Sequence, residues 1–204
     1  MTPLGRLHVL TDARAGRVPL EVVRAAVSAG APVVQVRAKG GTDRELYAFA
    51  TEVARLCAQH GSTCLVNDRP DVALAVGAAG VHLGEHDLPV DVVRRLIGPD
   101  AHVGGTAREP GAARALVEQG ASYLGVGPAY GTTTKDGLPE PLGAAGIRAV
   151  AEAVAVPVLA IGGVTVETVP ELLAAGAHGV AVVAAVSDAA DPAEATRRLL
   201  AALG

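Results

Sequence analysis

Eight short apolar runs alternate with longer, more polar stretches along the whole chain. The apolar runs are rich in Val, Leu, Ile and Ala, and they predict strands at about residues 7–11, 33–37, 63–67, 80–84, 102–106, 122–127, 157–162 and 179–184. The longer stretches predict helices near residues 19–29, 43–59, 70–77, 89–97, 110–119, 143–154, 166–175 and 192–203. Strands this apolar are typical of a parallel sheet that is covered on both faces, so an α/β fold is expected.

A loose internal repeat supports this alternation. Predicted helices end near Gly30, Gly77, Gly120 and Gly176, and an apolar strand follows each glycine directly. Glycine suits the left-handed position just after a helix because it has no side chain to clash there. The glycines are 47, 43 and 56 residues apart, which leaves room for two strand–helix units in each interval.

Two predicted helices also carry start signals. Thr42 to Glu45 has the composition of a capping box, and Asp191 followed by Pro192 is typical of a helix N-cap and first turn. Eight strand–helix units in 204 residues favour a single (β/α)8 TIM barrel over residues 1–204, forming one catalytic domain. No Gly-x-Gly-x-x-Gly follows the first strand, which argues against an open dinucleotide-binding sheet.

Composition narrows the classes of function. Aromatic residues are 2% of the chain and the net charge is −4, so neither stacking platforms nor a basic footprint for nucleic acid is present. No continuous apolar stretch reaches the about 18 residues of a membrane span, and the N-terminus lacks a signal-peptide core. Cys57 and Cys64 lack metal-ligand spacing and are expected to be reduced thiols. We therefore expect a cytoplasmic protein without nucleic-acid or membrane partners, and leave open whether it forms a homo-oligomer.

Polar residues cluster where the predicted strands end, the edge at which such barrels carry their active sites. Gln35, Arg37 and Lys39 alternate with apolar residues after the second strand, so they would share the face toward the barrel mouth. Two cations there are unfavourable unless an anion meets them, which indicates a phosphate or diphosphate clamp. A strand end that frays into solvent is the alternative.

Two carboxylates follow neighbouring strands. Asp68 comes after Asn67 at the end of the third strand, and Asp87 follows the fourth. Helix capping explains either one alone, since Pro70 and Pro89 mark helix starts. Together they could share a hard cation, and oxygen ligands favour Mg²⁺ held jointly with substrate phosphates.

Zinc bound through His82 or His86 is a weaker alternative to magnesium. His82 lies within the fourth predicted strand, where a histidine is more often a hydrogen-bonded structural residue.

The loop after the sixth strand combines a Gly127–Pro128 break with hydroxyls and an ammonium, Thr132, Thr134 and Lys135. Only Lys39 and Lys135 among the seventeen cationic residues are lysines, which indicates a need for a compact charge. The loop is not a Walker A motif. It is interpreted as an anion-binding loop, with a polar surface loop as the alternative.

The last two strands end in features typical of barrel phosphate sites, where backbone N–H groups hold the anion. The seventh ends at Gly162–Gly163 and the eighth runs through Val183 and Ala184, while the fifth ends at Thr106. Two anion pockets, one of them assisted by a metal, suit an enzyme that joins two phosphorylated small molecules and releases diphosphate.

These strand-end motifs, in this order, resemble those of the thiamine phosphate synthase family over essentially the whole chain. The matching motifs are Gln35-Val-Arg-Ala-Lys39, Asn67-Asp-Arg69, Gly80-Val-His-Leu-Gly84 with Asp87, Gly127-Pro128 with Thr132-Thr-Thr-Lys135, and Ala160-Ile-Gly-Gly163.

The resemblance implies a Mg²⁺-dependent condensation of hydroxymethylpyrimidine diphosphate with a thiazole phosphate or its carboxylated form, giving thiamine phosphate and pyrophosphate. It implies a dissociative displacement through a pyrimidine carbocation, with Thr106 and Lys135 as catalytic residues. It assigns pyrimidine diphosphate to Gln35, Arg37, Lys39, Asn67, Thr106 and Lys135. It assigns Mg²⁺ to Asp68 and Asp87, and thiazole phosphate to Thr132, Thr134, Gly163, Val183 and Ala184.

Three positions depart from the family pattern. Ala38 stands where an acid is usual, Thr106-Ala-Arg108 stands where Ser-x-His is usual, and Ala184 replaces a common serine. The histidine's role is therefore unfilled or passes to Arg108. Two alternatives stay open: a thiazole tautomerase relative, and a barrel that binds thiamine phosphate without catalysis.

Overall fold

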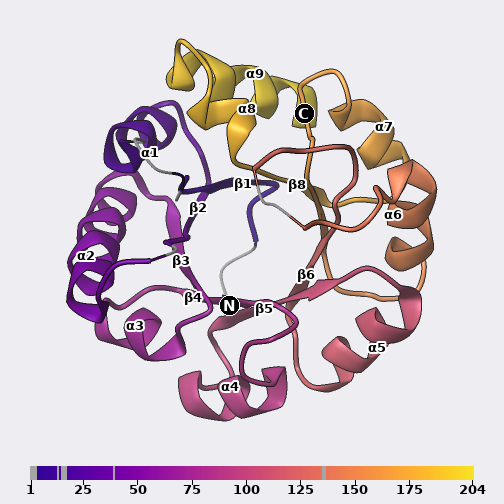
Figure 1. The fold of residues 1–204 in the computed structure, drawn as a ribbon, viewed down its shortest axis with the longest axis horizontal. Helices are drawn as coiled ribbons and strands as arrows, with labels where there is room; N and C mark the ends of the chain where they lie inside the picture. The colour runs from indigo at the N-terminus through magenta and orange to yellow at the C-terminus, as the bar shows by residue number, and fades with distance from the viewer. Residues whose placement is uncertain (1–3, 13, 15–17, 39, 135–136) are drawn as a thin grey trace.

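The computed structural model of the chain is a closed barrel of eight parallel strands, paired in sequence order and surrounded by helices (Figure 1). It describes residues 4–12, 14, 18–38, 40–134 and 137–204. The strands are β1 (Leu7–Leu10), β2 (Val33–Val36), β3 (Thr63–Asn67), β4 (Gly80–Leu83), β5 (His102–Ala107), β6 (Tyr123–Val126), β7 (Val158–Ile161) and β8 (Gly179–Val182). The predicted (β/α)8 barrel is confirmed.

The helices occupy the outer ring of Figure 1. They are α1 (Pro19–Ser28), α2 (Asp43–His60), α3 (Pro70–Ala75), α4 (Val90–Ile97), α5 (Pro110–Glu118), α6 (Gly143–Ala151), α7 (Val169–Ala174), α8 (Ala184–Ser187) and α9 (Pro192–Leu203). Both start signals are confirmed, because Thr42 forms a full capping box with Glu45 and the Asp191 side chain accepts the N–H of Glu194.

Several boundaries differ from the prediction by one to three residues, and two of them have a local structural cause. The helix expected from residue 166 begins at Val169, because Thr168 Oγ1 closes a local turn with the N–H and carbonyl of Thr165. The eighth strand ends at Val182 rather than residue 184, and the short helix α8 follows at once. A four-residue helix has too few positions for a periodic pattern, which is why the sequence did not reveal it.

The core lies mainly between barrel and helices, and it is aliphatic as the composition predicts. Strand alternation sends Val34 and Val36 outward into this layer. A second, smaller cluster of Val33, Leu65, Tyr123 and Leu159 fills the inside of the barrel. Tyr123 is thus the large aromatic residue of the interior.

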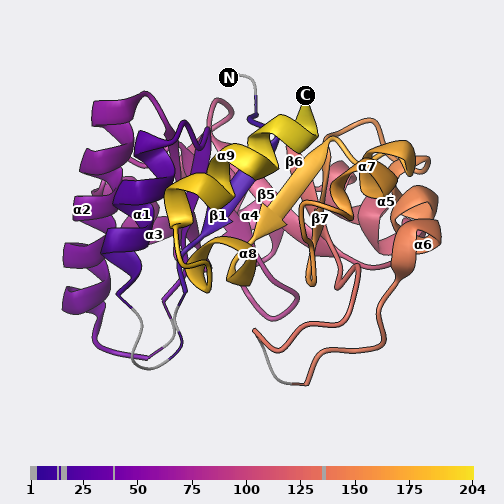
Figure 2. The ribbon, with the colours of Figure 1, turned by 90° about the horizontal axis from the view of Figure 1, so that it is seen from above.

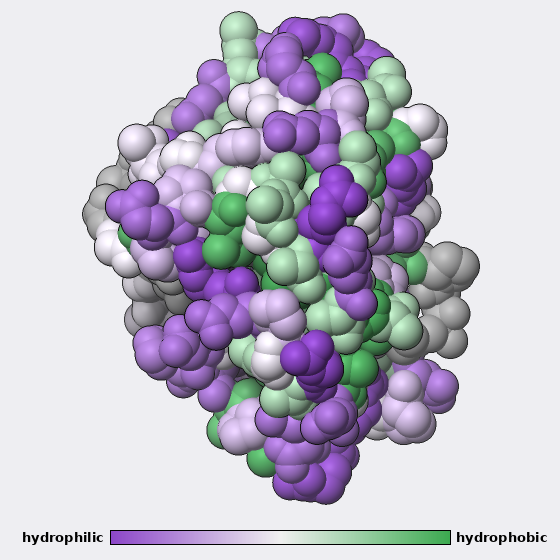
Figure 3. All heavy atoms as spheres, turned by 90° about the vertical axis from the view of Figure 1, so that its right-hand side faces the viewer, coloured by the Kyte–Doolittle hydropathy of each residue, from purple (hydrophilic) through white to green (hydrophobic). Residues whose placement is uncertain are grey.

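Cys57 and Cys64 are buried free thiols, as predicted. No helix among the described residues is long and apolar enough to cross a membrane. On the flank covered by α5 to α7, hydrophilic and hydrophobic residues are interspersed (Figure 3). The C-terminus lies at one end of the barrel and the long loop between β6 and α6 at the other (Figure 2).

Candidate active site at the carboxyl ends of the strands

A line of hydrogen-bonded side chains runs from β2 to the end of β3. Gln35, only 3% exposed, donates from Nε2 to Asn67 Oδ1 at 2.8 Å. Asn67 Nδ2 donates in turn to the Asp68 carboxylate. The two amides therefore hold each other, and one carboxylate oxygen, in a defined orientation inside the barrel mouth.

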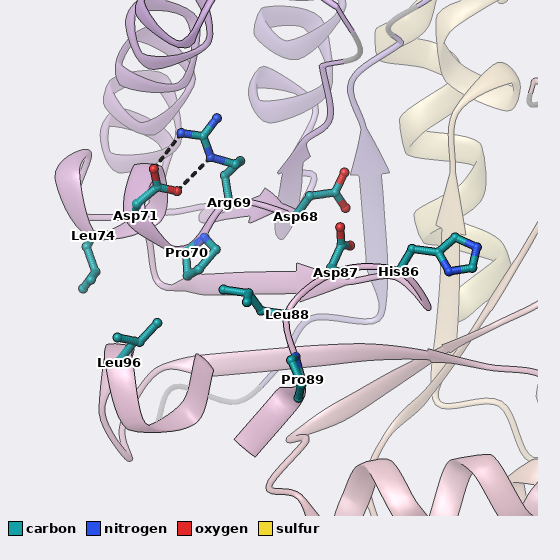
Figure 4. A pocket seen from close by; sticks show the side chains of 10 residues that line it. All are labelled: Asp68, Arg69, Pro70, Asp71, Leu74, His86, Asp87, Leu88, Pro89 and Leu96. Carbon is teal, nitrogen blue, oxygen red and sulfur yellow. Dashed lines mark hydrogen bonds and ion pairs between the residues drawn. The ribbon is translucent and has the colours of Figure 1, made fainter. Parts of the chain in front are cut away.

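Asp68 and Asp87 extend toward one another from the ends of β3 and β4 (Figure 4). Asp68 adopts φ +66°, an unusual conformation for a residue with a side chain, and its N–H donates to the His82 carbonyl at 2.8 Å. Asp87 Oδ2 accepts the N–H of Gly84 at 2.6 Å. Neither acid caps a helix, because the N-caps of α3 and α4 are Arg69 and Pro89 and neither has a side-chain capping bond.

The facing carboxylates suit a hard cation better than zinc. Carboxylate oxygens are the ligands that Mg²⁺ prefers, and two are sufficient when substrate phosphates complete the shell. No group of three or more His, Cys, Asp or Glu suited to a metal occurs in the described part of the chain. His82 uses both ring nitrogens in hydrogen bonds, so the zinc alternative through His82 lacks a free ligand atom.

A hollow of about 560 Å³ opens beside this carboxylate pair, between α3 and α4. It is lined by Asp68, Arg69, Pro70, Asp71, Leu74, His86, Asp87, Leu88, Pro89 and Leu96 (Figure 4). Arg69 is paired there with Asp71 at 2.6 Å. None of the other residues assigned above to the substrates lines this hollow where the structure describes them, so the carboxylates lie at the boundary between the hollow and the mouth.

His82 links two further strands. Its Nδ1 lies 3.1 Å from the Tyr123 hydroxyl, and its Nε2 lies 3.0 Å from Thr106 Oγ1. Burial lowers the pKa of His82 to about 4, although the nearby Asp68 charge partly opposes the shift. The prediction of a hydrogen-bonded strand histidine is confirmed, and Thr106 is exposed at the mouth end of β5.

The loop between β6 and α6 is fastened at both ends. Arg108, which follows β5, donates to the Gly127 carbonyl and to the Glu140 carbonyl at 2.8 Å each. The peptide bond from Gly127 to Pro128 is cis. Within the loop, Thr132 Oγ1 accepts the N–H of Thr134 at 3.3 Å and lies 3.2 Å from its hydroxyl. Arg108 is thus engaged with backbone carbonyls, a role that the sequence did not reveal.

The same loop packs against the Gly162–Gly163 turn that follows β7. The N–H groups of Ala129 and Tyr130 donate to the carbonyls of Ile161 and Gly162 at 2.8 and 3.0 Å. A Cβ on Gly163 would lie 2.5 Å from the Gly131 carbonyl oxygen, so this close approach requires glycine. The structure therefore brings the predicted Gly163 beside the loop that carries Thr132 and Thr134.

The remaining predicted residues occupy the strand ends in different ways. Arg37 is half-buried just after β2, with its N–H and carbonyl both bonded to Thr11 Oγ1 at 2.8 Å. Val183 precedes α8 and Ala184 opens it. Lys39 and Lys135 lie outside the described residues.

An ionic cluster at the end of β1 was missed from the sequence. Arg14 contacts Asp12 at 2.5 Å and Asp188 at 2.7 Å, and Ser187 donates to Asp12 at 2.9 Å. The hydrogen bond from Arg14 is the main cause that lowers the pKa of Asp12 to about 2. The signal was present, because Thr11 and Asp12 directly follow the first apolar run just as the polar residues follow the other strands.

Comparison with known proteins identifies the family. Residues 7–186 match the family model described as thiamine monophosphate synthase. The chain is 59% identical to the thiamine-phosphate synthase of Salinispora arenicola and 58% identical to that of Salinispora tropica, in each case over 100% of this chain and 99% of the relative.

Solved structures agree. Thiamine phosphate pyrophosphorylase from Pyrococcus furiosus superposes with a TM-score of 0.89 at 35% identity, over 97% of this chain and 95% of that one. A 3-hexulose-6-phosphate synthase, 19% identical with a TM-score of 0.70 over 98% of this chain and 100% of that one, shares the fold alone. The chain belongs to the thiamine monophosphate synthase family, as its strand-end motifs predicted.

Proposed function

We propose that this protein condenses hydroxymethylpyrimidine diphosphate with a thiazole phosphate, or its carboxylated form, to give thiamine phosphate and pyrophosphate. Family membership supports this reaction class. The observation that carries it is the facing pair Asp68 and Asp87 beside the Gln35–Asn67 amides. A diphosphate needs positive charge and polar contacts at one place, and Mg²⁺ held by the carboxylates would supply the charge while the amides supply the contacts. We further propose that the enzyme acts in the cytoplasm.

The pyrimidine diphosphate would occupy the side of the mouth formed by β2 to β6. Its proposed partners are Gln35, Arg37, Lys39, Asn67, Thr106 and Lys135. The Gln35–Asn67 bond supports this assignment, because an amide held in one orientation needs no reordering when substrate binds. Asp68 and Asp87 would hold Mg²⁺, which when bound supplies positive charge to the diphosphate oxygens.

The thiazole phosphate would lie toward β7 and β8. Its proposed partners are Thr132, Thr134, Gly163, Val183 and Ala184. The contact between Gly163 and the loop at Gly131 supports one shared pocket for the first three of these residues. Backbone N–H groups at Val183 and Ala184 would complete it.

In the proposed reaction the bond from the pyrimidine methylene carbon to the diphosphate oxygen breaks, and its electron pair leaves with diphosphate. The thiazole nitrogen then donates its lone pair to the resulting carbocation, forming the new carbon–nitrogen bond. With the uncarboxylated thiazole no proton is transferred. With the carboxylated form, the bond from the ring carbon to the carboxyl group also breaks, carbon dioxide leaves, and the electron pair left on the ring carbon takes up a proton from solvent. Thr106 and Lys135 would stabilise the negative charge that grows on the departing oxygen, which is the electrostatic stabilisation such a step needs.

The direct experiment measures pyrophosphate release when purified protein receives both phosphorylated substrates and Mg²⁺. Release that requires both substrates and stops with a chelator is expected. A folded protein that releases no pyrophosphate would exclude the proposal.

The same experiment distinguishes the two alternatives. Isomerisation of the thiazole without a pyrimidine substrate would indicate the tautomerase. Tight thiamine phosphate binding by calorimetry without turnover would indicate a non-catalytic barrel, an alternative kept in view by Ala38 and by the engagement of Arg108 with backbone carbonyls.

A further inference from the structure

Three side chains from neighbouring strands form a continuous hydrogen-bonded line inside the barrel. Tyr123 on β6 contacts His82 Nδ1 at 3.1 Å, and His82 Nε2 contacts Thr106 Oγ1 at 3.0 Å. Tyr123 is 1% exposed, whereas Thr106 is exposed at the mouth. The line therefore runs from the closed interior of the barrel to its open end.

Strand register and glycines create this line. His82 pairs in register with Gly104, and Gly104 pairs with Tyr123, so the glycine stands between the two rings. A Cβ on Gly104 would lie 2.4 Å from the Tyr123 hydroxyl and 2.5 Å from His82 Nδ1. The hydroxyl meets the imidazole only because β5 has no side chain at that position.

The protonation of His82 determines which group donates and which accepts in each of these hydrogen bonds. A neutral imidazole has one N–H donor and one acceptor nitrogen. The Tyr123 hydroxyl is buried, and it can donate to the imidazole only if the ring nitrogen that it contacts carries no proton.

The buried phenol decides which nitrogen carries the proton. The Tyr123 hydroxyl has no other hydrogen-bond partner among the described residues, and a buried donor without an acceptor is unfavourable. Tyr123 therefore donates to His82 Nδ1, and the proton of the ring resides on Nε2. The Nε2–H donates to Thr106 Oγ1, which leaves the threonine's own O–H to point elsewhere.

We propose that Tyr123 and His82 are positioning residues that make the Thr106 hydroxyl a hydrogen-bond donor toward the barrel mouth. This inference rests on the proposed function, in which Thr106 meets the departing diphosphate. With its oxygen occupied by the Nε2–H, the hydroxyl proton is presented to an anion rather than turned back to the ring. The Tyr123–His82 pair thus prepares the donor before substrate arrives.

The tautomer is tested without any activity measurement. Two-bond ¹H–¹⁵N correlation spectra of ¹⁵N-histidine-labelled protein near pH 7 report which ring nitrogen is protonated, and the His82 signals are assigned by their loss in His82→Gln. We expect the Nε2–H form for His82. An Nδ1–H form would overturn the inference even if the enzyme makes thiamine phosphate, and this outcome is independent of whether the proposed function holds.

Kinetics test the consequence for Thr106. In Tyr123→Phe the ring loses its fixed tautomer, and kcat for pyrophosphate release should fall about tenfold, with KM changed less than about twofold, because one oriented donor to a charged oxygen is lost. Tyr47→Phe, which removes an exposed hydroxyl on α2, serves as the matched control and should leave kcat unchanged.

A double-mutant cycle separates positioning from general damage. The Tyr123→Phe effect should disappear in a Thr106→Ala background and persist in Thr106→Ser, which keeps the hydroxyl. An equal loss in the Ala and wild-type backgrounds would show that Tyr123 acts through packing alone and would overturn the proposal. If Tyr123→Phe does not fold, the tautomer measurement on the unmodified protein still tests the proposal.

Discussion

At the scale of single residues, the mouth of the barrel is organised by side chains that hold each other. Asn67 is bonded on one side to Gln35 and on the other to Asp68. Asp68 itself has a left-handed backbone, which among residues with side chains Asn and Asp tolerate best. The side chains of the site are therefore held in place by hydrogen bonds to one another, so single substitutions can test the role of each.

Asp68→Asn should abolish Mg²⁺-dependent turnover while leaving the fold intact. Asparagine tolerates the positive φ of this position and has nearly the same volume, so the change removes mainly the charge. We expect pyrophosphate release to fall by more than about a hundredfold, the scale of a lost electrostatic contact in an active site. Mn²⁺ binding in the presence of diphosphate, followed by electron paramagnetic resonance, should weaken in parallel.

Asp71→Asn is the matched control for this substitution. Asp71 lines the same hollow but is exposed and paired with Arg69, so its loss should change activity less than about twofold, as is usual for exposed ion pairs. Full activity in Asp68→Asn would show that the metal assignment is wrong.

Lys135→Arg is predicted not to be conservative. Lys135 lies outside the described residues, so its role stays a prediction from the lysine census of the sequence. A planar guanidinium cannot replace a compact ammonium in a close pocket, and kcat should fall at least about tenfold. Unchanged steady-state kinetics would support the alternative interpretation, in which Lys135 belongs to a polar surface loop without a role in binding.

At the scale of elements, two side-chain links hold connecting segments to the barrel. Arg108 joins the end of β5 to both ends of the loop between β6 and α6. The Asp12–Arg14–Ser187 cluster joins the end of β1 to α8. Each link fastens an element that carries proposed thiazole phosphate ligands.

Arg108→Ala should loosen the loop after β6 more than it destabilises the protein. Two hydrogen bonds from a charged donor are lost, but the backbone bonds from Ala129 and Tyr130 to the β7 end remain. We expect KM for the thiazole phosphate to rise about tenfold, as one to two such bonds would give. Faster amide exchange within residues 127–142 should accompany it.

Arg114→Ala provides the control, since Arg114 is an exposed arginine on the neighbouring helix α5. It should leave both KM and exchange unaltered. Equal exchange of the loop in Arg108→Ala and the unmodified protein would contradict the fastening role.

The Asp12 cluster predicts an acid-sensitive link. The pKa of Asp12 is lowered to about 2, chiefly by its hydrogen bond with Arg14, so this carboxylate stabilises the folded state fully above its usual pKa near 3.8. That stabilisation is lost as pH falls from about 4 toward 2. Asp12→Asn should therefore reduce the free energy of unfolding at pH 7 by up to about 2 kcal/mol.

Denaturant titrations at pH 7, 4 and 2.5 check this expectation. The difference between Asp12→Asn and the unmodified protein should shrink at pH 2.5, because Asp12 is then protonated in the unfolded chain and most of the stabilisation is lost. Asp91→Asn, which removes an exposed pair with Arg95, should show a much smaller difference at pH 7. A difference that stays constant with pH would contradict the ionic origin.

At the scale of the whole molecule, the barrel interior encloses neutral histidines. His8 is 0% exposed and packs against Tyr123 with ring centroids 5.5 Å apart. Neither ring nitrogen of His8 has a hydrogen-bond partner in the described part of the chain. Burial, aided by the nearby His82, lowers the pKa of His8 to about 3, and the Gly5 backbone opposes this shift only in part.

This arrangement predicts loss of stability in mild acid. Below about pH 6.5 the His8 imidazole takes up a proton in the unfolded chain, but buried His8 in the folded protein does not. The free energy of unfolding is therefore highest above pH 6.5 and falls as the pH is lowered toward 3. His8 alone should account for up to about 2 kcal/mol between pH 6.5 and 5. In His8→Leu, the decline of the unfolding free energy over this range should be measurably shallower. An identical slope would show that His8 is protonated in the fold.

Much of the fold followed from the sequence, and the site followed in part. Apolar runs and glycine-terminated helices located every strand, because burial on both faces leaves a local composition that can be read directly. Gln35, Asn67 and Asp68 were identified because each lies at a strand end. The Tyr123–His82 contact and the Arg108 fastening were not, since they join residues 41 and 19 or more positions apart.

The sequence by itself determined the (β/α)8 architecture and the strand ends that carry chemistry, because these depend on local patterns of burial and polarity. The family was predicted from the resemblance of its strand-end motifs. Only the tertiary structure decided how the side chains are paired: which way Asp68 faces, what Arg108 binds, and how a tyrosine on β6 reaches a histidine on β4. The physical reason is register. Closing the barrel fixes which residues stand opposite one another, and a glycine between two strands becomes a contact site only once that alignment exists.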